Sequence, residues 1–224
     1  WILDPLCFML IYVFMFGYVF KSKQQYFAIF VFIGITLWDF FNKSLIQSVK
    51  VIKANKPIVS KVYIPKFILI LVKMGVNGFK MLISLLIIVA MLIVWRVPMT
   101  YNVIYIIPIL MTLVVLVFGC CCFLLHYGVF VEDLSNVLNI VLRFLFYLTG
   151  IFWNIMDRLP SPYNYYIGRC NPIAFLLTSA RDCVIYGSTP HRKLLLLWFV
   201  IGLIISALGV RKIYKNENSY VKVI

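Results

Sequence analysis

Polar and charged residues recur at helical spacing within two of the hydrophobic stretches of this sequence. At 100° of rotation per residue, one set covers an arc of about 80° on a single helix: Asn136, Asn139, Arg143, Tyr147, Gly150 and Asn154. A second set covers about 60° on another helix: Lys66, Lys73, Asn77, Lys80 and Ser84. Charged side chains inside a bilayer face a partner or a water-filled path. The two stripes therefore predict a hydrated path, where Arg143, Lys73 and Lys80 would meet an anionic group such as phosphate.

A simpler interpretation stays open for each charged residue taken singly. Asp39 could pair with Arg143 across two helices, or with Lys43 four residues farther along its own helix. Lys73 and Lys80 could lie in an end of their helix that protrudes into water. The first stripe as a whole favours a path, because six aligned positions exceed what one ion pair requires. We expect Asp39 to lie along that path as well.

No group of residues in the sequence has the spacing of a catalytic or metal site. The two histidines, His126 and His191, fall in breaks on opposite faces of the membrane, so they cannot share a metal or a proton. Glu132 and Asp133 are the one closely spaced acidic pair, and they lie in a loop. The Gly-rich phosphate loop of ATPases is absent from the sequence. We therefore expect a chain with no catalytic site, metal or cofactor of its own, for which another subunit would hydrolyse ATP.

The composition indicates a membrane protein. Hydrophobic residues make up 64% of the 224 residues and charged residues only 12%, which excludes a water-soluble globule. The net charge of +14 does not indicate nucleic-acid binding, because the basic residues lie in the breaks between apolar stretches. Lysine and arginine in such breaks anchor helix ends and set topology. We predict an all-α polytopic protein in a lipid bilayer, with no nucleic-acid partner.

Six apolar stretches approach or exceed the length of about 20 residues that crosses the hydrocarbon core. We predict spanning helices at 5–20, 26–49, 67–95, 103–125, 134–156 and 194–210. An even number of spans places both ends of the chain on one side. The breaks on that side carry nine Lys and Arg residues against eight on the other, and they are shorter, which favours a cytoplasmic location.

Residues 50–66, with the sequence KVIKANKPIVSKVYIPK, form a short basic break between the second and third predicted spans. Five lysines lie in this break, and Pro57 and Pro65 prevent it from being one continuous helix. We predict a loop with a short amphipathic helix at the membrane surface and call it the coupling segment. A partner that contacts the coupling segment could move the two helices that it joins.

The longest break follows the fifth predicted span, and we call its residues 157–187 the lid region. It contains Pro160 and then the tyrosines Tyr163, Tyr165 and Tyr166, which could stack on sugar rings, although interfacial tyrosines ordinarily anchor. Asn followed by Pro is an N-cap and first-turn signal, so Asn171 and Pro172 predict a helix over 173–186 that Gly187 ends. At about 14 residues this helix is too short to span, so it should be re-entrant or interfacial.

Two cysteines of the lid region, Cys170 and Cys183, could form a disulfide if the region faces an oxidising compartment. The other four cysteines of the chain lie in apolar stretches, where cysteine behaves as a small hydrophobic residue.

With these elements in order, the sequence resembles the permease subunits of the type 2 ABC exporters that move lipid-linked polysaccharides and teichoic acids. The most specific match lies in the block 34–66, around the second span and the coupling segment: Trp38, Phe40, Phe41, Ser44, Leu45, Ser48, Asn55, Val62 and Pro65. A second match consists of Asn171 and Pro172 with the downstream Arg181 and Asp182. Glu132 and Asp133 depart from the family, which has Arg-Asp at that place.

The resemblance implies a single permease domain over 1–224, preceded by an amphipathic N-terminal segment that is missing, because Trp1, Asp4 and Pro5 look like the start of the family's first membrane helix. It implies a homodimer bound to two ATPase subunits, which would hold ATP and Mg, in the plasma (inner) membrane of a bacterium. Contacts to the ATPase would come from both cytoplasmic loops: Lys53, Ala54, Asn55, Ile58, Lys61, Val62, Pro65, Glu132 and Asp133. An outer gate would be formed by the lid region: Pro160, Tyr163, Tyr165, Tyr166, Asn171, Pro172 and Arg181.

The substrate implied by the resemblance is a polyprenyl-linked polysaccharide or teichoic acid. Two alternatives stay open at the level of the sequence. One is a drug or lipid exporter of the same architecture, and the other is a polytopic membrane enzyme that modifies glycans.

Overall fold

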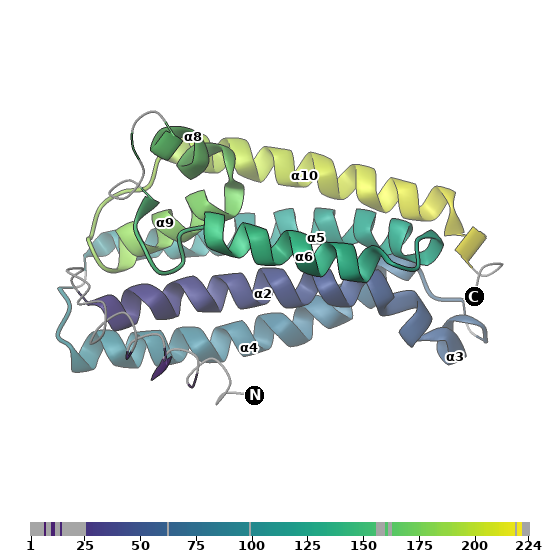
Figure 1. Cartoon of the computed structure of the whole chain (residues 1–224), viewed down its shortest axis with the longest axis horizontal. Coiled ribbons are helices and arrows are strands. Elements are labelled where there is room, and N and C mark those ends of the chain that lie inside the picture. The colour runs from purple at the N-terminus through teal and green to yellow at the C-terminus, as the bar shows by residue number, and fades with distance from the viewer. Residues whose placement is uncertain are drawn as a thin grey trace. The chain divides into compact units, whose positions relative to one another are not determined.

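The computed structural model describes most of the chain: Cys7, Leu10, Ile11, Phe14, 26–61, 63–98, 100–155, Pro160, 163–217, Ser219 and Tyr220. All regular secondary structure among these residues is helical (Figure 1). The elements follow one another as α2 (Phe27–Ala54), α3 (Lys56–Val59), α4 (Lys66–Val94), η2 (Tyr101–Tyr105), α5 (Ile106–Phe130), α6 (Leu134–Leu148), α8 (Tyr163–Cys170), α9 (Pro172–Val184) and α10 (Arg192–Lys215). The prediction of an all-α protein is therefore confirmed.

The chain forms two compact units. The first contains residues 1–39, 79–110 and 145–195, and the second contains 40–78, 111–144 and 196–224. The long helices α2, α4, α5 and α10 each contribute residues to both units. The lid region lies in the first unit, whereas the coupling segment lies in the second.

Among the described residues, four helical stretches are long and apolar enough to cross a membrane, so the chain is a multi-pass membrane protein. They are Phe27–Ala54, Lys66–Val94, Tyr101–Phe130 and Arg192–Lys215, and each corresponds to one predicted span. The predicted span 5–20 lies almost wholly outside the described residues. The predicted fifth span corresponds to α6, whose 15 residues are fewer than a spanning helix needs.

The predicted helix over 134–156 is wrong beyond Leu148, where α6 ends. Gly150 has a φ of +67°, a conformation outside the helical region that glycine adopts readily. A Cβ at Gly150 would come within 2.6 Å of Ile155 Cγ1, so only glycine fits the turn. The chain continues through Ile151–Asn154 without helical structure.

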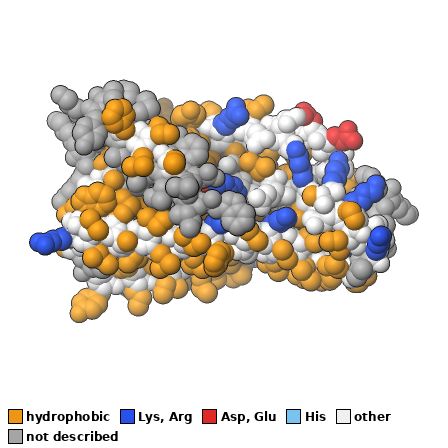
Figure 2. Space-filling view, turned by 90° about the horizontal axis from the view of Figure 1, so that it is seen from below, with side chains coloured by type: hydrophobic (Ala, Val, Ile, Leu, Met, Phe, Trp, Pro, Cys, Tyr) orange, Lys and Arg blue, Asp and Glu red, His pale blue; other side chains and the backbone are white. Residues whose placement is uncertain are grey.

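Much of the described surface is hydrophobic, as expected of helices that meet lipid or another transmembrane chain. Figure 2 shows broad areas of hydrophobic side chains on one face of the molecule. On α4, for example, the side chains of Phe79, Leu86 and Ile93 are 65–69% exposed at a spacing of seven residues, so one side of this helix is apolar and uncovered. A soluble protein would bury such a stripe.

Candidate coupling surface, polar stripes and lid

The coupling segment begins as the last turn of α2. This helix continues to Ala54, and the chain turns at Asn55, whose Nδ2 donates a hydrogen bond of 2.7 Å to the Val51 carbonyl. The short α3 follows, with Pro57 in its first turn and Val59 buried beneath it. The expected short helix is therefore present in the coupling segment.

The residues predicted to contact an ATPase differ in exposure. Val59 is the buried residue of α3, and most of the predicted contact residues are exposed. Lys53, Ala54, Ile58 and Lys61 are exposed, Asn55 and Pro65 are half-buried, and Val62 lies outside the described residues. Ile58 is an apolar side chain that is 49% exposed between lysines. An exposed apolar residue flanked in the sequence by lysines suits a partner surface that is hydrophobic at its centre and acidic around it.

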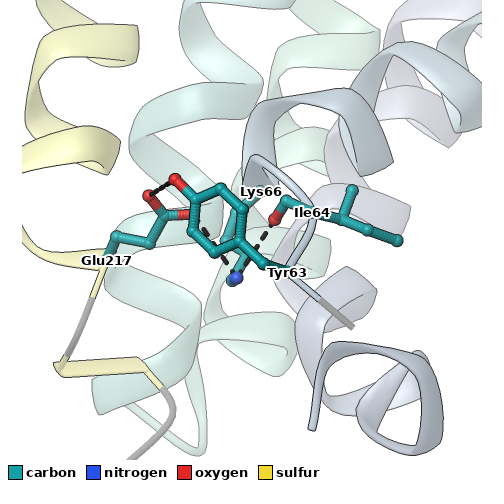
Figure 3. A network of polar contacts seen from close by, with 4 residues as sticks. All are labelled: Tyr63, Ile64, Lys66 and Glu217. Atoms are coloured by element: carbon teal, nitrogen blue, oxygen red, sulfur yellow. Dashed lines mark hydrogen bonds and ion pairs between the residues drawn. The ribbon is translucent and has the colours of Figure 1, made fainter. Parts of the chain in front are cut away.

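The end of the coupling segment is held by an ion pair that Figure 3 shows. Lys66 Nζ lies 3.4 Å from Glu217 Oε1 and donates a 3.0 Å hydrogen bond to the Ile64 carbonyl. The Tyr63 hydroxyl donates to Glu217 Oε2 at 3.1 Å. This hydrogen bond, and then the carboxylate charge, raise the pKa of Tyr63. The sequence analysis did not single out Glu217. Only seven residues of this strongly basic chain are acidic, and this scarcity is a signal that could have identified Glu217.

The second predicted cytoplasmic loop lies between α5 and α6. Glu132 and Asp133 are both exposed there. Asp133 Oδ1 accepts a 2.6 Å hydrogen bond from Asn136 Nδ2, so this carboxylate holds the first turn of α6. A carboxylate at a helix N-terminus also interacts favourably with the helix dipole.

The first polar stripe is shorter than predicted. Asn136, Arg143 and Tyr147 are exposed on α6 and Asn139 is half-buried, so these four residues do share one accessible side of the helix. Gly150 and Asn154 lie beyond the end of α6 and are not aligned with them. Apolar residues on α6 are exposed as well, among them Ile140 and Phe144 at 69% and 66%. Arg143 thus stands among hydrophobic side chains in the isolated chain.

The second polar stripe is divided between packing and exposure. Asn77 is buried, and its Nδ2 donates to Ser44 Oγ at 3.2 Å and to Gln47 Oε1 at 3.1 Å, which joins α4 to α2. Ser84 is also buried, and its hydroxyl donates to the Lys80 carbonyl at 3.2 Å. Lys73 is exposed, whereas Lys80 and Asp39 are half-buried. Helical spacing correctly predicted that the residues of this stripe share one side of α4. It could not tell whether that side packs against another helix or lines a hydrated path.

The described part of the lid region contains the helices α8 and α9. Asn171 forms the predicted N-cap, since its Oδ1 accepts hydrogen bonds from the backbone N–H groups of Ile173 and Ala174 at 3.1 and 3.3 Å. Pro172 then begins α9, which ends at Val184, and Gly187 has a φ of +63° just beyond it. The predicted helix is therefore confirmed, whereas the helix before it, α8, was not predicted. Of the residues predicted to form the outer gate, Pro160, Tyr163, Tyr165 and Tyr166 are exposed.

Arg181 does not lie at a surface but is 3% exposed within the first unit. Its guanidinium donates three hydrogen bonds to backbone carbonyls: Nε to Phe30 at 3.0 Å, Nη1 to Gly150 at 2.8 Å and Nη2 to Ile151 at 2.6 Å. The guanidinium also stacks on the Phe30 ring, 3.5 Å from its centroid. Two of these carbonyls, those of Gly150 and Ile151, lie in the non-helical turn after α6, whereas Phe30 lies in the first turn of α2, so Arg181 joins that turn to α2.

The remaining titratable groups do not gather into a metal site. No three His, Cys, Asp or Glu side chains come together among the described residues. His126 is buried against Tyr220, and His191 Nε2 lies 3.3 Å from Arg169 Nη2. Cys170 and Cys183 are both free thiols, the first exposed and the second buried.

Comparison with known proteins identifies two relatives. No family model matches the chain. Two curated proteins named O-antigen export system permease protein RfbA, both of Klebsiella pneumoniae, are each 24% identical to it. The alignments cover 99% and 100% of this chain and 85% of each relative. These two relatives confirm the resemblance of the chain to the permease subunits of type 2 ABC polysaccharide exporters.

Proposed function

We propose that this chain is the permease subunit of an ATP-driven exporter that moves a polysaccharide on a lipid carrier across the plasma membrane of a bacterium. The single observation that carries the proposal is the match to two O-antigen export permeases over 99% or more of the chain. The polymer would be an O-antigen, a capsule or a teichoic acid, and a nucleotide-binding subunit would hold ATP and Mg.

The exposed residues of the coupling segment support an ATPase partner. Lys53, Ile58 and Lys61 face outward, and all three lie in the second unit together with Glu132 and Asp133 of the other loop. A push on α3 would reach α2 directly, since a single turn at Asn55 separates the two helices. Two ATPase subunits would each engage one permease chain in this way.

The position of Arg143 supports a homodimer around a hydrated path. An arginine at the centre of a bilayer costs at least about 2.5 kcal/mol when no partner or water meets it. In the single chain the Arg143 side chain is exposed on α6, beside the exposed Ile140 and Phe144. A second copy of the chain would cover the apolar residues of α6 and leave Arg143, Asn139 and Tyr147 beside water and an anionic group of the substrate.

The test compares surface polymer in cells with and without this chain. Loss of the chain is expected to remove the polymer from the surface and to accumulate its lipid-linked form in the cytoplasm. Surface polymer that persists without such accumulation would refute the proposed function. Arg143→Ala is expected to lower export at unchanged membrane abundance, and Arg192→Ala, at an exposed arginine near η2, is the matched control.

A further inference from the structure

The last turn of α10 and the residues that follow it pack against the rest of the second unit. Ile213, Glu217 and Tyr220 are 1%, 8% and 0% exposed, and they repeat at the spacing of one helical face. Between them, Tyr214 is half exposed and Lys215 is exposed. A polar segment buries one face in this regular way only when it has a defined binding surface in the protein.

Glu217 joins this segment to the end of the coupling segment. Lys66 is 2% exposed, so the ion pair between Lys66 and Glu217 is nearly removed from water. Removing one partner would leave the other charge buried and unpaired, which is strongly destabilising. The contact therefore requires both residues. The Tyr63 hydroxyl donates to the second carboxylate oxygen. Both oxygens of Glu217 are therefore used to hold residues 63–66.

Tyr220, three residues farther along, joins the same segment to the end of α5. Its hydroxyl lies 2.8 Å from His126 Nδ1, and both side chains are buried. Its ring also packs edge-on against His126 and beside Phe130, with centroids 5.9 and 6.1 Å away. Phe130 is the last residue of α5, two residues before Glu132. One short segment thus contacts the base of both predicted cytoplasmic loops.

We propose that Glu217 and Tyr220 are positioning residues that hold the coupling segment and the end of α5 in a fixed relation to each other and to α10. This proposal rests on the proposed function, because the position of these loops matters for transport only if an ATPase pushes on them. A displacement of the coupling segment would then pass through Lys66 and Glu217 to α10, as well as to α2 and α4. Neither residue would contact substrate or nucleotide.

The first experiment measures the motion of the coupling segment and needs no partner. A spin label is attached at Lys61→Cys, an exposed position, in a background in which the exposed Cys7 and Cys170 are serine. Glu217→Gln and Tyr220→Phe are expected to increase the mobility of the label. Lys215→Gln and Tyr214→Phe are the matched controls on the outer side of the same segment. Unchanged mobility in Glu217→Gln and Tyr220→Phe would overturn the proposal, whatever the protein transports.

The second experiment uses the chain reconstituted with its ATPase subunit in liposomes. Glu217→Gln is expected to lower polymer transported per ATP hydrolysed about 2- to 30-fold, the range over which single residues alter coupling, while ATPase binding is retained. Transport and hydrolysis that fall together with the amount of folded protein would show a structural role only, and would overturn the proposal. Absence of any ATPase binding in the unaltered chain would instead refute the proposed function, and the label mobility would still test the positioning.

A second variant keeps the test decisive if Glu217→Gln does not fold. Lys66→Met combined with Glu217→Leu removes both charges and fills their space with apolar groups, a replacement that buried ion pairs tolerate. This double variant is expected to fold and to bind the ATPase, yet to transport less polymer per ATP, because the Tyr63 hydroxyl has lost its acceptor. Full transport per ATP in the double variant would overturn the proposal.

Discussion

Replacing Arg181 should unfold the turn after α6, because this one side chain satisfies three buried backbone carbonyls. Hydrogen bonds from a charged group contribute about 1.5–3 kcal/mol each, so the three bonds sum to about 4–9 kcal/mol. The cost of burying the guanidinium offsets several kcal/mol of that sum. We therefore expect Arg181→Met to reduce the free energy of unfolding by about 2–5 kcal/mol. The free energy of unfolding of Arg181→Lys should lie between those of the unaltered chain and Arg181→Met, since an ammonium group cannot reach three acceptors as the planar guanidinium does.

The assay is thermal unfolding of the purified chain in detergent micelles. At about 2–4 °C per kcal/mol for a chain of this length, Arg181→Met should lower Tm by about 4–20 °C. The exposed Arg192→Met is the control for loss of one positive charge, and it should leave Tm nearly unchanged. A Tm for Arg181→Met equal to that of Arg192→Met would refute the assignment of the three carbonyls to Arg181.

A second variant examines the same contact from the other side. A Cβ at Gly34 would lie 2.5 Å from Arg181 Nη2 and 3.3 Å from the Ile151 carbonyl oxygen. Gly34→Ala should therefore displace the guanidinium and lower Tm. Because both changes break the same hydrogen bonds, the double variant should be little worse than Arg181→Met alone. Additive losses would show that Gly34 and Arg181 act separately.

Three further predictions concern single side chains. Asn171→Ala removes the N-cap of α9 and should cost about 1 kcal/mol, measured as a lower Tm, whereas Asn171→Ser should retain most of the stability. Asn77→Ala should lower Tm through its lost hydrogen bonds to Ser44 and Gln47, and a large loss of export at unchanged Tm would instead place Asn77 on the substrate path. Burial raises the pKa of Asp182 to about 6 from 3.8, although Arg181 and His191 act in the opposite direction. A raised carboxyl pKa means that stability decreases as pH rises from about 4 to 6, by at most about 3 kcal/mol, and Asp182→Asn should remove that part of the pH dependence.

The elements that the sequence predicted correctly are those with local signals. Long apolar stretches identified α2, α4, α5 and α10, and the Asn-Pro pair located the start of α9 to within one residue. Both signals depend on a few neighbouring residues and on the polarity of the environment, so they can be recognised without knowing the fold.

The features that the sequence did not predict depend on residues far apart in the chain. Residues 149–156 are apolar enough to continue α6, yet the helix ends before them. Gly150 adopts a positive φ, and Arg181, 31 positions away, donates a hydrogen bond to the Gly150 carbonyl. The pairing of Lys66 with Glu217 joins residues from the two ends of the second unit. The stripe on α4 predicted which side of the helix carries the polar residues. It did not predict which element packs against that side, which for Asn77 is α2.

Helix α9 lies in the region expected to form an outer gate, and ten of its thirteen residues are buried. It contacts both α8 and η2 within the first unit. Swinging α9 out by itself would expose a face of Ile, Leu and Phe side chains to water and would strand the Arg181 charge. In the proposed exporter, an outlet is therefore easier to form by shifting α8, α9 and η2 together than by moving α9 alone.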